Sequence, residues 1–127
     1  YWVNVPVNQP LKYFIRTGGG GIGLFSNGTN AGLAISISAT SSATGSITLG
    51  SWHHVVGTYD GTTISVYIDN VLTGTTNHPG QIDGTGSAAG PLVLGFFNSA
   101  YWQGSIDDLR FYDRVLTAAE IQTLFNE

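Results

Sequence analysis

Two adjacent histidines, His53 and His54, lie in the stretch SWHHVVGTYDG, and histidine is a common metal ligand and catalytic base. The stretch reads as a β-strand, because it is rich in β-branched and aromatic residues and ends at a turn signal. Neighbouring residues of a strand point to opposite faces, whereas a chelating pair needs i, i+2 spacing on a strand or i, i+4 spacing on a helix. We therefore expect both histidines to serve packing rather than a metal or catalytic site.

A carboxylate with possible metal chemistry is Asp107, in the stretch SIDDLRFY. In a continuous strand it shares a face with Leu109 and Phe111, which are expected core residues. A carboxylate on that face needs a partner, because burial of an unpaired charge is costly. One candidate is Ca²⁺, which takes carboxylates together with backbone carbonyls and waters. The alternative is a salt bridge to Arg110 or Arg114, or hydrogen bonds from backbone N–H groups.

The loop FNSAYWQG (residues 97–104) has the residue types of a carbohydrate site. Sugar rings stack on aromatic faces, and amide side chains bond to their hydroxyl groups. Tyr101, with Asn98 and Gln103 beside it, is the candidate ligand-binding set. Trp102 is expected to pack inward instead, because tryptophan is heavily buried on average.

The sequence indicates no enzyme. Glycosidases need two facing carboxylates, but the only glutamates are Glu120, in a terminal helix, and Glu127, the last residue. Asp107 and Asp108 are adjacent and would point to opposite faces of a strand. The sequence has no nucleophile-elbow motif, and GGGGIG leads into strand-like residues rather than into a phosphate-binding helix.

Composition narrows the classes of partner. Charged residues make up 9% of the 127 residues, and the net charge is −4, so a nucleic-acid partner is not expected. The chain has no cysteine for disulfides or thiolate metal sites, and no apolar run long enough to span a membrane. It also has no methionine, and from this we expect a piece of a longer or processed chain.

Short apolar-polar alternations separated by turn residues run through most of the chain and predict an all-β fold. Asp69 and Asn70 predict a hairpin turn, because both residues tolerate a positive φ. The terminal stretch LTAAEIQTLF changes to a helical period, with Thr117 and Glu120 as a capping box. The sequence therefore predicts one domain over residues 1–127, an antiparallel β-sandwich or jelly roll with one short C-terminal helix.

Two long stretches, GSWHHVVGTYDGTTISVYIDNVLTGT and GSIDDLRFYDRVLTAAEIQTLF, resemble the laminin G-like, concanavalin A-like jelly-roll domains. The order and spacing of the Trp-His-His-Val, Thr-Tyr-Asp-Gly and Gly-x-Ile-Asp-Asp motifs match, and the resemblance covers most of the chain from Tyr13 onward. It implies a buried Trp52 beside the histidine strand and an inward-packed Trp102. It also implies a structural Ca²⁺ at Asp107, because related domains often hold one through an aspartate at the start of the last strand.

The N-terminal stretch YWVNVP departs from this pattern. It resembles the second main strand of the family, so that the first strand is absent; in the other register it is the first strand, with a short link to the next. In the first case the sheet lacks a partner strand, which a neighbouring chain could donate by strand addition.

Together these features predict a non-catalytic module that binds carbohydrate or glycoprotein at a cell surface, virion surface or other extracellular site. The alternative is a structural subunit of a virion, fibre or surface layer that self-associates or exchanges strands. Low charge and abundant Ser, Thr, Gly and Asn suit both functions.

Overall fold

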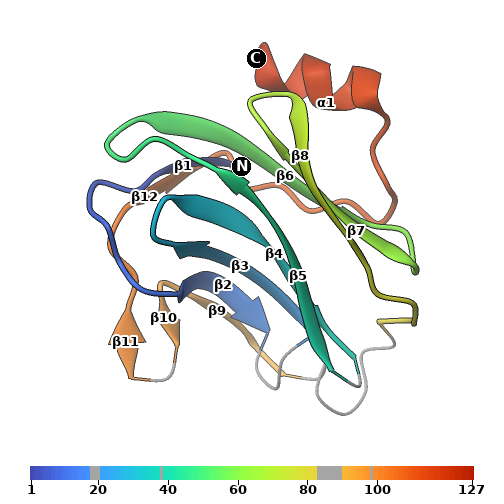
Figure 1. Ribbon diagram of the computed structural model, residues 1–127, viewed down its shortest axis with the longest axis horizontal. Helices are drawn as coiled ribbons and strands as arrows, with labels where there is room; N and C mark the ends of the chain where they lie inside the picture. The colour runs from blue at the N-terminus through green and yellow to red at the C-terminus, as the bar shows by residue number, and fades with distance from the viewer. Residues whose placement is uncertain (18–20, 38, 83–89, 98) are drawn as a thin grey trace.

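The structure is a computed structural model that describes residues 1–17, 21–37, 39–82, 90–97 and 99–127. Two five-stranded antiparallel sheets face each other, and a short helix covers part of the outer face of one sheet (Figure 1). The predicted all-β jelly-roll class is therefore confirmed. Among the described residues, no helix is long and apolar enough to cross a membrane.

The first sheet has the strand order β12-β1-β6-β7-β8, and the second has the order β5-β4-β3-β2-β9. A separate two-stranded hairpin, β10-β11, lies beside the second sheet (Figure 1). The bounds are β1 (Trp2–Asn4), β2 (Lys12–Thr17), β3 (Ile22–Asn27), β4 (Asn30–Ser36), β5 (Thr40–Ser46), β6 (Trp52–Tyr59), β7 (Thr63–Ile68), β8 (Val71–Asn77), β9 (Leu92–Leu94), β10 (Phe96–Phe97), β11 (Ala100–Tyr101), β12 (Ser105–Asp107) and α1 (Ala118–Phe125).

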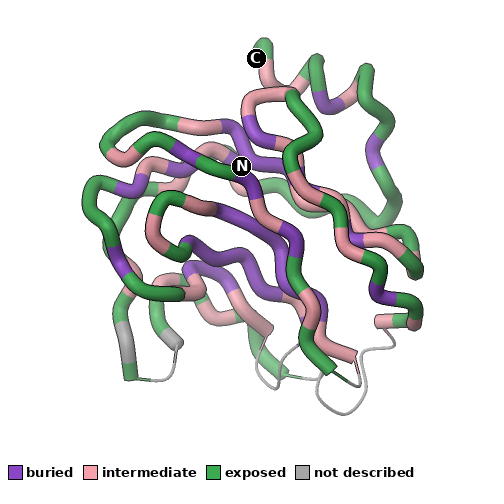
Figure 2. The backbone as a smooth tube through the Cα atoms, viewed as in Figure 1, coloured by how far each residue is buried: buried purple, intermediate pink, exposed green. Residues whose placement is uncertain are grey.

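The core lies between the two sheets, where buried residues line the inner strands (Figure 2). β7 shows the alternation most clearly, because Ile64, Val66 and Ile68 are buried while the residues between them are partly exposed. Such alternation places one apolar face of each strand against the opposite sheet. The two sheets approach closely at Gly57, where an added Cβ would lie 2.7 Å from the Leu33 side chain.

The hairpin between β7 and β8 turns at Asp69 and Asn70, whose φ angles are 50° and 66°. Positive φ at both central residues is the geometry of the tight turns that match the twist of paired strands. The predicted turn is therefore confirmed.

The helix α1 begins with the predicted capping box. Thr117 Oγ1 accepts a hydrogen bond from the Glu120 N–H, and the Glu120 carboxylate accepts one from the Thr117 N–H at 2.8 Å. The helix buries Ile121 against Val56 and Leu116 on the outer face of the first sheet. The helix therefore forms a third, partial layer.

Two sequence expectations are wrong in detail. Trp52 was expected to be buried, but it is 47% exposed, because it starts β6 on the outer face of the sheet, away from the buried Val56 that packs against α1. Asp107 was expected to share a buried strand face with Leu109 and Phe111. The strand instead ends at Asp107, and Asp108 follows with a φ of 48°, so the alternation breaks; Asp107 and Phe111 are exposed, and only Leu109 packs on the core.

Candidate functional site

The hairpin β10-β11 presents the most exposed of the large apolar side chains in the described part of the chain. Tyr101 is 73% exposed, and its ring centre lies 4.8 Å from that of Phe96, with the rings tilted by 45°. The two residues lie directly opposite each other in the hairpin. An exposed aromatic pair of this kind offers ring faces to a ligand without further rearrangement.

Trp102 fixes the base of this hairpin. Its backbone N–H donates to the Gly95 carbonyl at 2.9 Å, and its ring Nε1 donates to Ser26 Oγ at 2.9 Å. Its ring centre lies 5.0 Å from that of Phe14, a fully buried core residue. The expectation that Trp102 packs inward is therefore confirmed, and Tyr101 is held directly beside an anchored residue.

Gln9 holds the chain just after β11 through hydrogen bonds to Gln103. Its buried side chain donates to the Gln103 carbonyl at 2.9 Å and to Ser26 Oγ at 3.3 Å, and it accepts from the Gln103 N–H at 3.3 Å. These bonds hold the backbone of Gln103, while Gln103 itself is exposed. The sequence gives no sign of this role for Gln9 or Ser26, because the hydrogen-bonded residues lie far apart in the chain.

Lys12, the only lysine of the chain, lies against the same hairpin. Its Nζ donates to the Tyr101 carbonyl at 3.2 Å. An ammonium has three donor hydrogens, so this bond leaves donors for another oxygen. Lys12 therefore adds a cation and a hydrogen-bond donor that the sequence analysis did not assign to the site.

A hollow of about 460 Å³ opens beside the hairpin. Its lining residues are mostly apolar: Phe14, Leu94, Gly95, Trp102, Gly104, Ile106 and Leu109.

Two of the three candidate ligand-binding residues, Tyr101 and Gln103, therefore lie together at this end of the molecule. Asn98 lies outside the described residues. Binding by this set remains a prediction, and Phe96 and Lys12 join it on geometry.

The two histidines lie on opposite faces of β6, as the sequence predicts. His53 bonds to Asp69 and to the Thr48 N–H. His54 is buried on the outer face, with its ring 5.1 Å from that of Trp2 and 6.0 Å from that of Phe125. Burial, with the nearby N-terminal charge, lowers the pKa of His54 to about 4. The neutral ring packs between aromatic side chains, in line with the expected packing role.

Asp107, the residue expected to hold calcium, lies at the end of β12. Asp107 is exposed, and its Oδ1 accepts a hydrogen bond from the Asp108 N–H at 2.8 Å. Within the ranges that the structure describes, no three His, Asp or Glu side chains converge to hold a metal ion. One carboxylate does not make a calcium site, which needs six to eight oxygen ligands. The described residues do not fit such a site, and calcium binding remains a prediction from the family resemblance.

The two-sheet jelly roll, the outer helix and the braced aromatic hairpin define a lectin-like β-sandwich. A family model described as the concanavalin A-like lectin/glucanases superfamily, of the laminin G type, matches residues 1–122, and the chain belongs to this family. No curated protein matches the chain. Among solved structures, an S-layer domain-containing protein from Clostridium thermocellum is similar, with a TM-score of 0.52 and 25% identity over 98% of this chain and 67% of that chain.

Proposed function

We propose that the chain is a non-catalytic recognition module that binds a carbohydrate or a glycoprotein through the β10-β11 hairpin. The observation that carries this proposal is the 73% exposure of Tyr101 on a hairpin whose base is fixed by partly buried hydrogen bonds. A rigid site loses little conformational entropy when it binds its ligand.

The chemistry of the hairpin suits a sugar. The apolar face of a pyranose ring stacks on an aromatic ring, here Tyr101 with Phe96 beside it. The sugar hydroxyl groups need donors and acceptors around that ring, which the Gln103 amide and the Lys12 ammonium supply. The net charge of −4 disfavours strongly anionic ligands, so neutral sugars are the preferred class.

The two glutamates support the assignment as non-catalytic. Arg114 bonds to Glu120 at 2.6 Å, and this bond, with those from Thr117, lowers the pKa of Glu120 to about 2. A glycosidase general acid needs a raised pKa, so Glu120 has the wrong electrostatic environment. Glu127, the last residue, forms an ion pair with Arg110, with 2.6 Å between Glu127 Oε2 and Arg110 Nη1.

The test is glycan-array binding of the purified chain, run in parallel with Ca²⁺ and with EDTA. We expect binding to a class of neutral sugars. For Tyr101→Ala we expect a dissociation constant at least ten times higher, which is a loss of about 1.4 kcal/mol of binding free energy. Val71→Ala is the matched control, because Val71 is 61% exposed but lies on the β7-β8 hairpin. Equal binding by both variants would remove the hairpin from the site. Loss of binding in EDTA would support the calcium prediction.

A second function, a structural subunit of a surface layer, is favoured by the similarity to an S-layer domain-containing protein. Both functions place the protein at a cell surface. Exposed Val71 and Leu72 on the edge strand β8 would suit contacts between copies, because unprotected edge strands pair with other chains. Sedimentation of the purified chain at increasing concentration tests this: concentration-dependent oligomers with a blank glycan array would favour the structural function over recognition.

A further inference from the structure

The hollow beside the β10-β11 hairpin adjoins the proposed sugar site. Gly95 and Trp102 line the hollow, and they are the direct neighbours of Phe96 and Tyr101 in the chain. The Trp102 N–H donates to the Gly95 carbonyl at 2.9 Å, so these two residues lie side by side next to the aromatic pair. Successive residues of an extended chain are about 3.3 Å apart along its axis. The hollow is therefore within reach of a substituent on a sugar that stacks on Tyr101.

The hollow extends from an exposed rim to the core. Leu94 lines it and is 60% exposed, whereas Phe14, which also lines it, is fully buried. Trp102, Ile106 and Leu109 are partly buried and pack against the core cluster. The volume of about 460 Å³ is within the range of about 300–1,000 Å³ that is usual for small-molecule sites. A ligand group that enters at Leu94 therefore meets apolar side chains.

The described residues that line the hollow offer no free polar side chain. Trp102 is the only one of them with a polar side-chain atom, and its Nε1 already donates to Ser26 Oγ at 2.9 Å. The backbone of Gly95 is also engaged, since its N–H donates to the Phe14 carbonyl at 2.8 Å and its carbonyl accepts from Trp102. Sugar hydroxyl groups buried here would lose their hydrogen bonds to water without replacement, which is costly. An apolar group would instead gain free energy from the same burial.

The surface around the aromatic pair has a polar part and an apolar part. Gln103 is exposed beside Tyr101, and Lys12 Nζ bonds to the Tyr101 carbonyl, so this part can serve the hydroxyl groups of a sugar. Leu94 and Phe96 are also exposed, and they have no hydrogen-bonding side chains. A neutral sugar covers an aromatic ring with one face and needs hydrogen bonds elsewhere. The apolar part therefore exceeds what a sugar alone would use.

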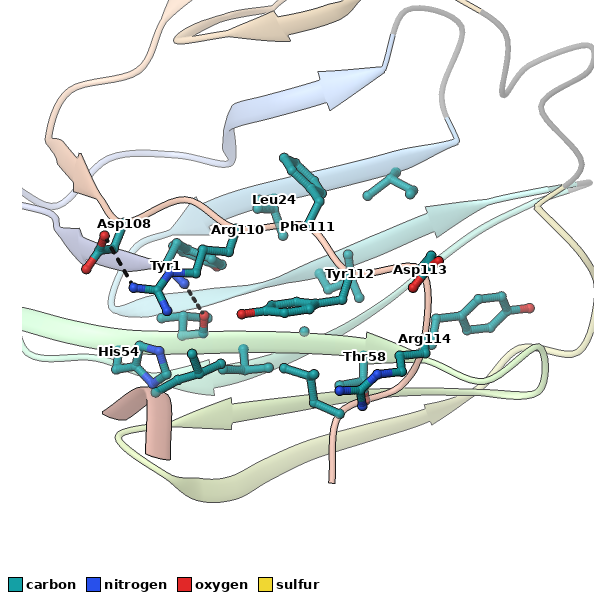
Figure 3. A pocket seen from close by; sticks show the side chains of 18 of the residues that line it. Tyr1, Leu24, His54, Thr58, Asp108, Arg110, Phe111, Tyr112, Asp113 and Arg114 are labelled. Carbon is teal, nitrogen blue, oxygen red and sulfur yellow. Dashed lines mark hydrogen bonds and ion pairs between the residues drawn. The ribbon is translucent and has the colours of Figure 1, made fainter. Parts of the chain in front are cut away.

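A larger cavity, of about 520 Å³, lies between β6 and residues 110–114 (Figure 3). Charged side chains contribute to its lining, and the close view shows four of them: Asp108, Arg110, Asp113 and Arg114. An apolar group placed there would take water away from charged groups, which is costly. This cavity is therefore a weaker match for an apolar group than the hollow. Phe111, which lines it and is 56% exposed, provides a control position.

We propose that the ligand of the hairpin site is a neutral glycoside, whose apolar alkyl or aryl group fills the hollow while its sugar ring stacks on Tyr101. This inference rests on the proposed function and adds the class of sugar derivative that the site prefers. Burial of the apolar group supplies affinity, and the Gln103 amide and the Lys12 ammonium supply hydrogen bonds to the sugar.

The test is isothermal titration calorimetry of the purified chain with the methyl, hexyl and phenyl glycosides of glucose, galactose and mannose. We expect the hexyl and phenyl forms to bind at least about tenfold more tightly than the methyl form of the same sugar, because they bury more apolar surface. Leu94→Asp places a carboxylate at the rim of the hollow. It should remove this difference and leave the affinity for the methyl glycoside unchanged.

Two variants are matched controls, because each places the same carboxylate at an exposed apolar residue outside the hollow. Leu92→Asp changes a residue of β9 that is 48% exposed, and Phe111→Asp changes the larger cavity. Both should keep the preference for the hexyl and phenyl glycosides. Circular dichroism checks that each variant is folded.

Equal affinity for the methyl, hexyl and phenyl forms would overturn this inference and leave the proposed sugar recognition intact. Binding of none of the glycosides, together with a blank glycan array, would overturn the proposed function and this inference with it. Equal affinity for the hexyl glycoside and 1-hexanol would also overturn the inference, as would loss of the preference in Phe111→Asp alone. Tighter binding of the hexyl than of the phenyl form would assign a lipid-like chain to the ligand, and the reverse order an aryl group.

Discussion

The Nδ1 atom of His53 lies 2.7 Å from Oδ2 of Asp69, and this pair ties the start of β6 to the turn between β7 and β8. The other ring nitrogen, Nε2, accepts a hydrogen bond from the Thr48 N–H at 2.9 Å. An accepting nitrogen carries no proton, so Nδ1–H of a neutral imidazole donates to the carboxylate. Both ring nitrogens are engaged, which leaves neither for a metal ion or for proton transfer.

Replacement of Asp69 by alanine is expected to destabilise the protein by about 2–4 kcal/mol. The variant loses the bonds to His53 and to the His54 N–H, which Asp69 Oδ1 accepts at 2.9 Å, and it places alanine at a φ of 50°. Urea unfolding measures the change. Asn70→Gly is the control in the same turn, because glycine adopts a φ of 66° without strain. Equal stability of all three proteins would show that the carboxylate contributes nothing.

His54 should make stability depend on pH. Its pKa is lowered to about 4, mainly by burial, against 6.5 in the unfolded chain. Between these values the unfolded state binds more protons than the folded state. The contribution of His54 to the free energy of unfolding is therefore complete above pH 6.5 and is lost as the pH drops toward 4. We expect a loss of up to about 1.4 kcal/mol per pH unit in this window. Urea unfolding at several pH values measures the slope, and His54→Leu should flatten it; an unchanged slope would assign the dependence to other groups.

The parts of the fold that the sequence predicted rest on local chemistry. The Asp69-Asn70 turn follows from two residues that accept a positive φ, and the helix start follows from Thr117 and Glu120 at capping-box spacing. The inward packing of Trp102 follows from residue type and the family pattern. Each of these features is decided within a few residues of sequence.

The parts that the sequence did not predict depend on distant contacts. The bond from Gln9 to Gln103 joins residues 94 positions apart, and nothing near Gln9 signals it. The exposure of Asp107 depends on where β12 ends, and that of Trp52 on how far α1 extends over the sheet. The place of β1 between β6 and β12 depends on its register against two distant strands, which no local pattern encodes.

Removal of the Tyr1 hydroxyl, in the variant Tyr1→Phe, is expected to stabilise the protein. This oxygen is buried with no hydrogen-bond partner among the described residues, and burial raises the pKa of Tyr1. Its ring packs edge-on against Phe14, with centres 5.4 Å apart. Tyr1→Phe keeps this packing and removes an unsatisfied polar group, so we expect a gain of about 1 kcal/mol in urea unfolding. Tyr101→Phe, at an exposed ring, should change nothing; a loss of stability for Tyr1→Phe would reveal a partner for the hydroxyl.

Substitutions of Gln9 and Gln103 should distinguish a residue that supports the site from a residue that contacts the ligand directly. Gln9→Ala removes three hydrogen bonds from a buried side chain and takes their partner from the Gln103 N–H and carbonyl, while Ser26 Oγ keeps its bond from Trp102. We expect a loss of about 2–4 kcal/mol in urea unfolding, together with weaker binding of any sugar identified on the array.

Gln103→Ala keeps those bonds, because Gln9 contacts only the backbone of Gln103. It should leave the unfolding free energy unchanged within about 0.5 kcal/mol and still weaken binding, measured by isothermal titration calorimetry. Unchanged binding in both variants would remove this end of the hairpin from the site. Weakened binding in Gln9→Ala alone would make Gln103 a residue whose backbone, and not its side chain, matters to recognition.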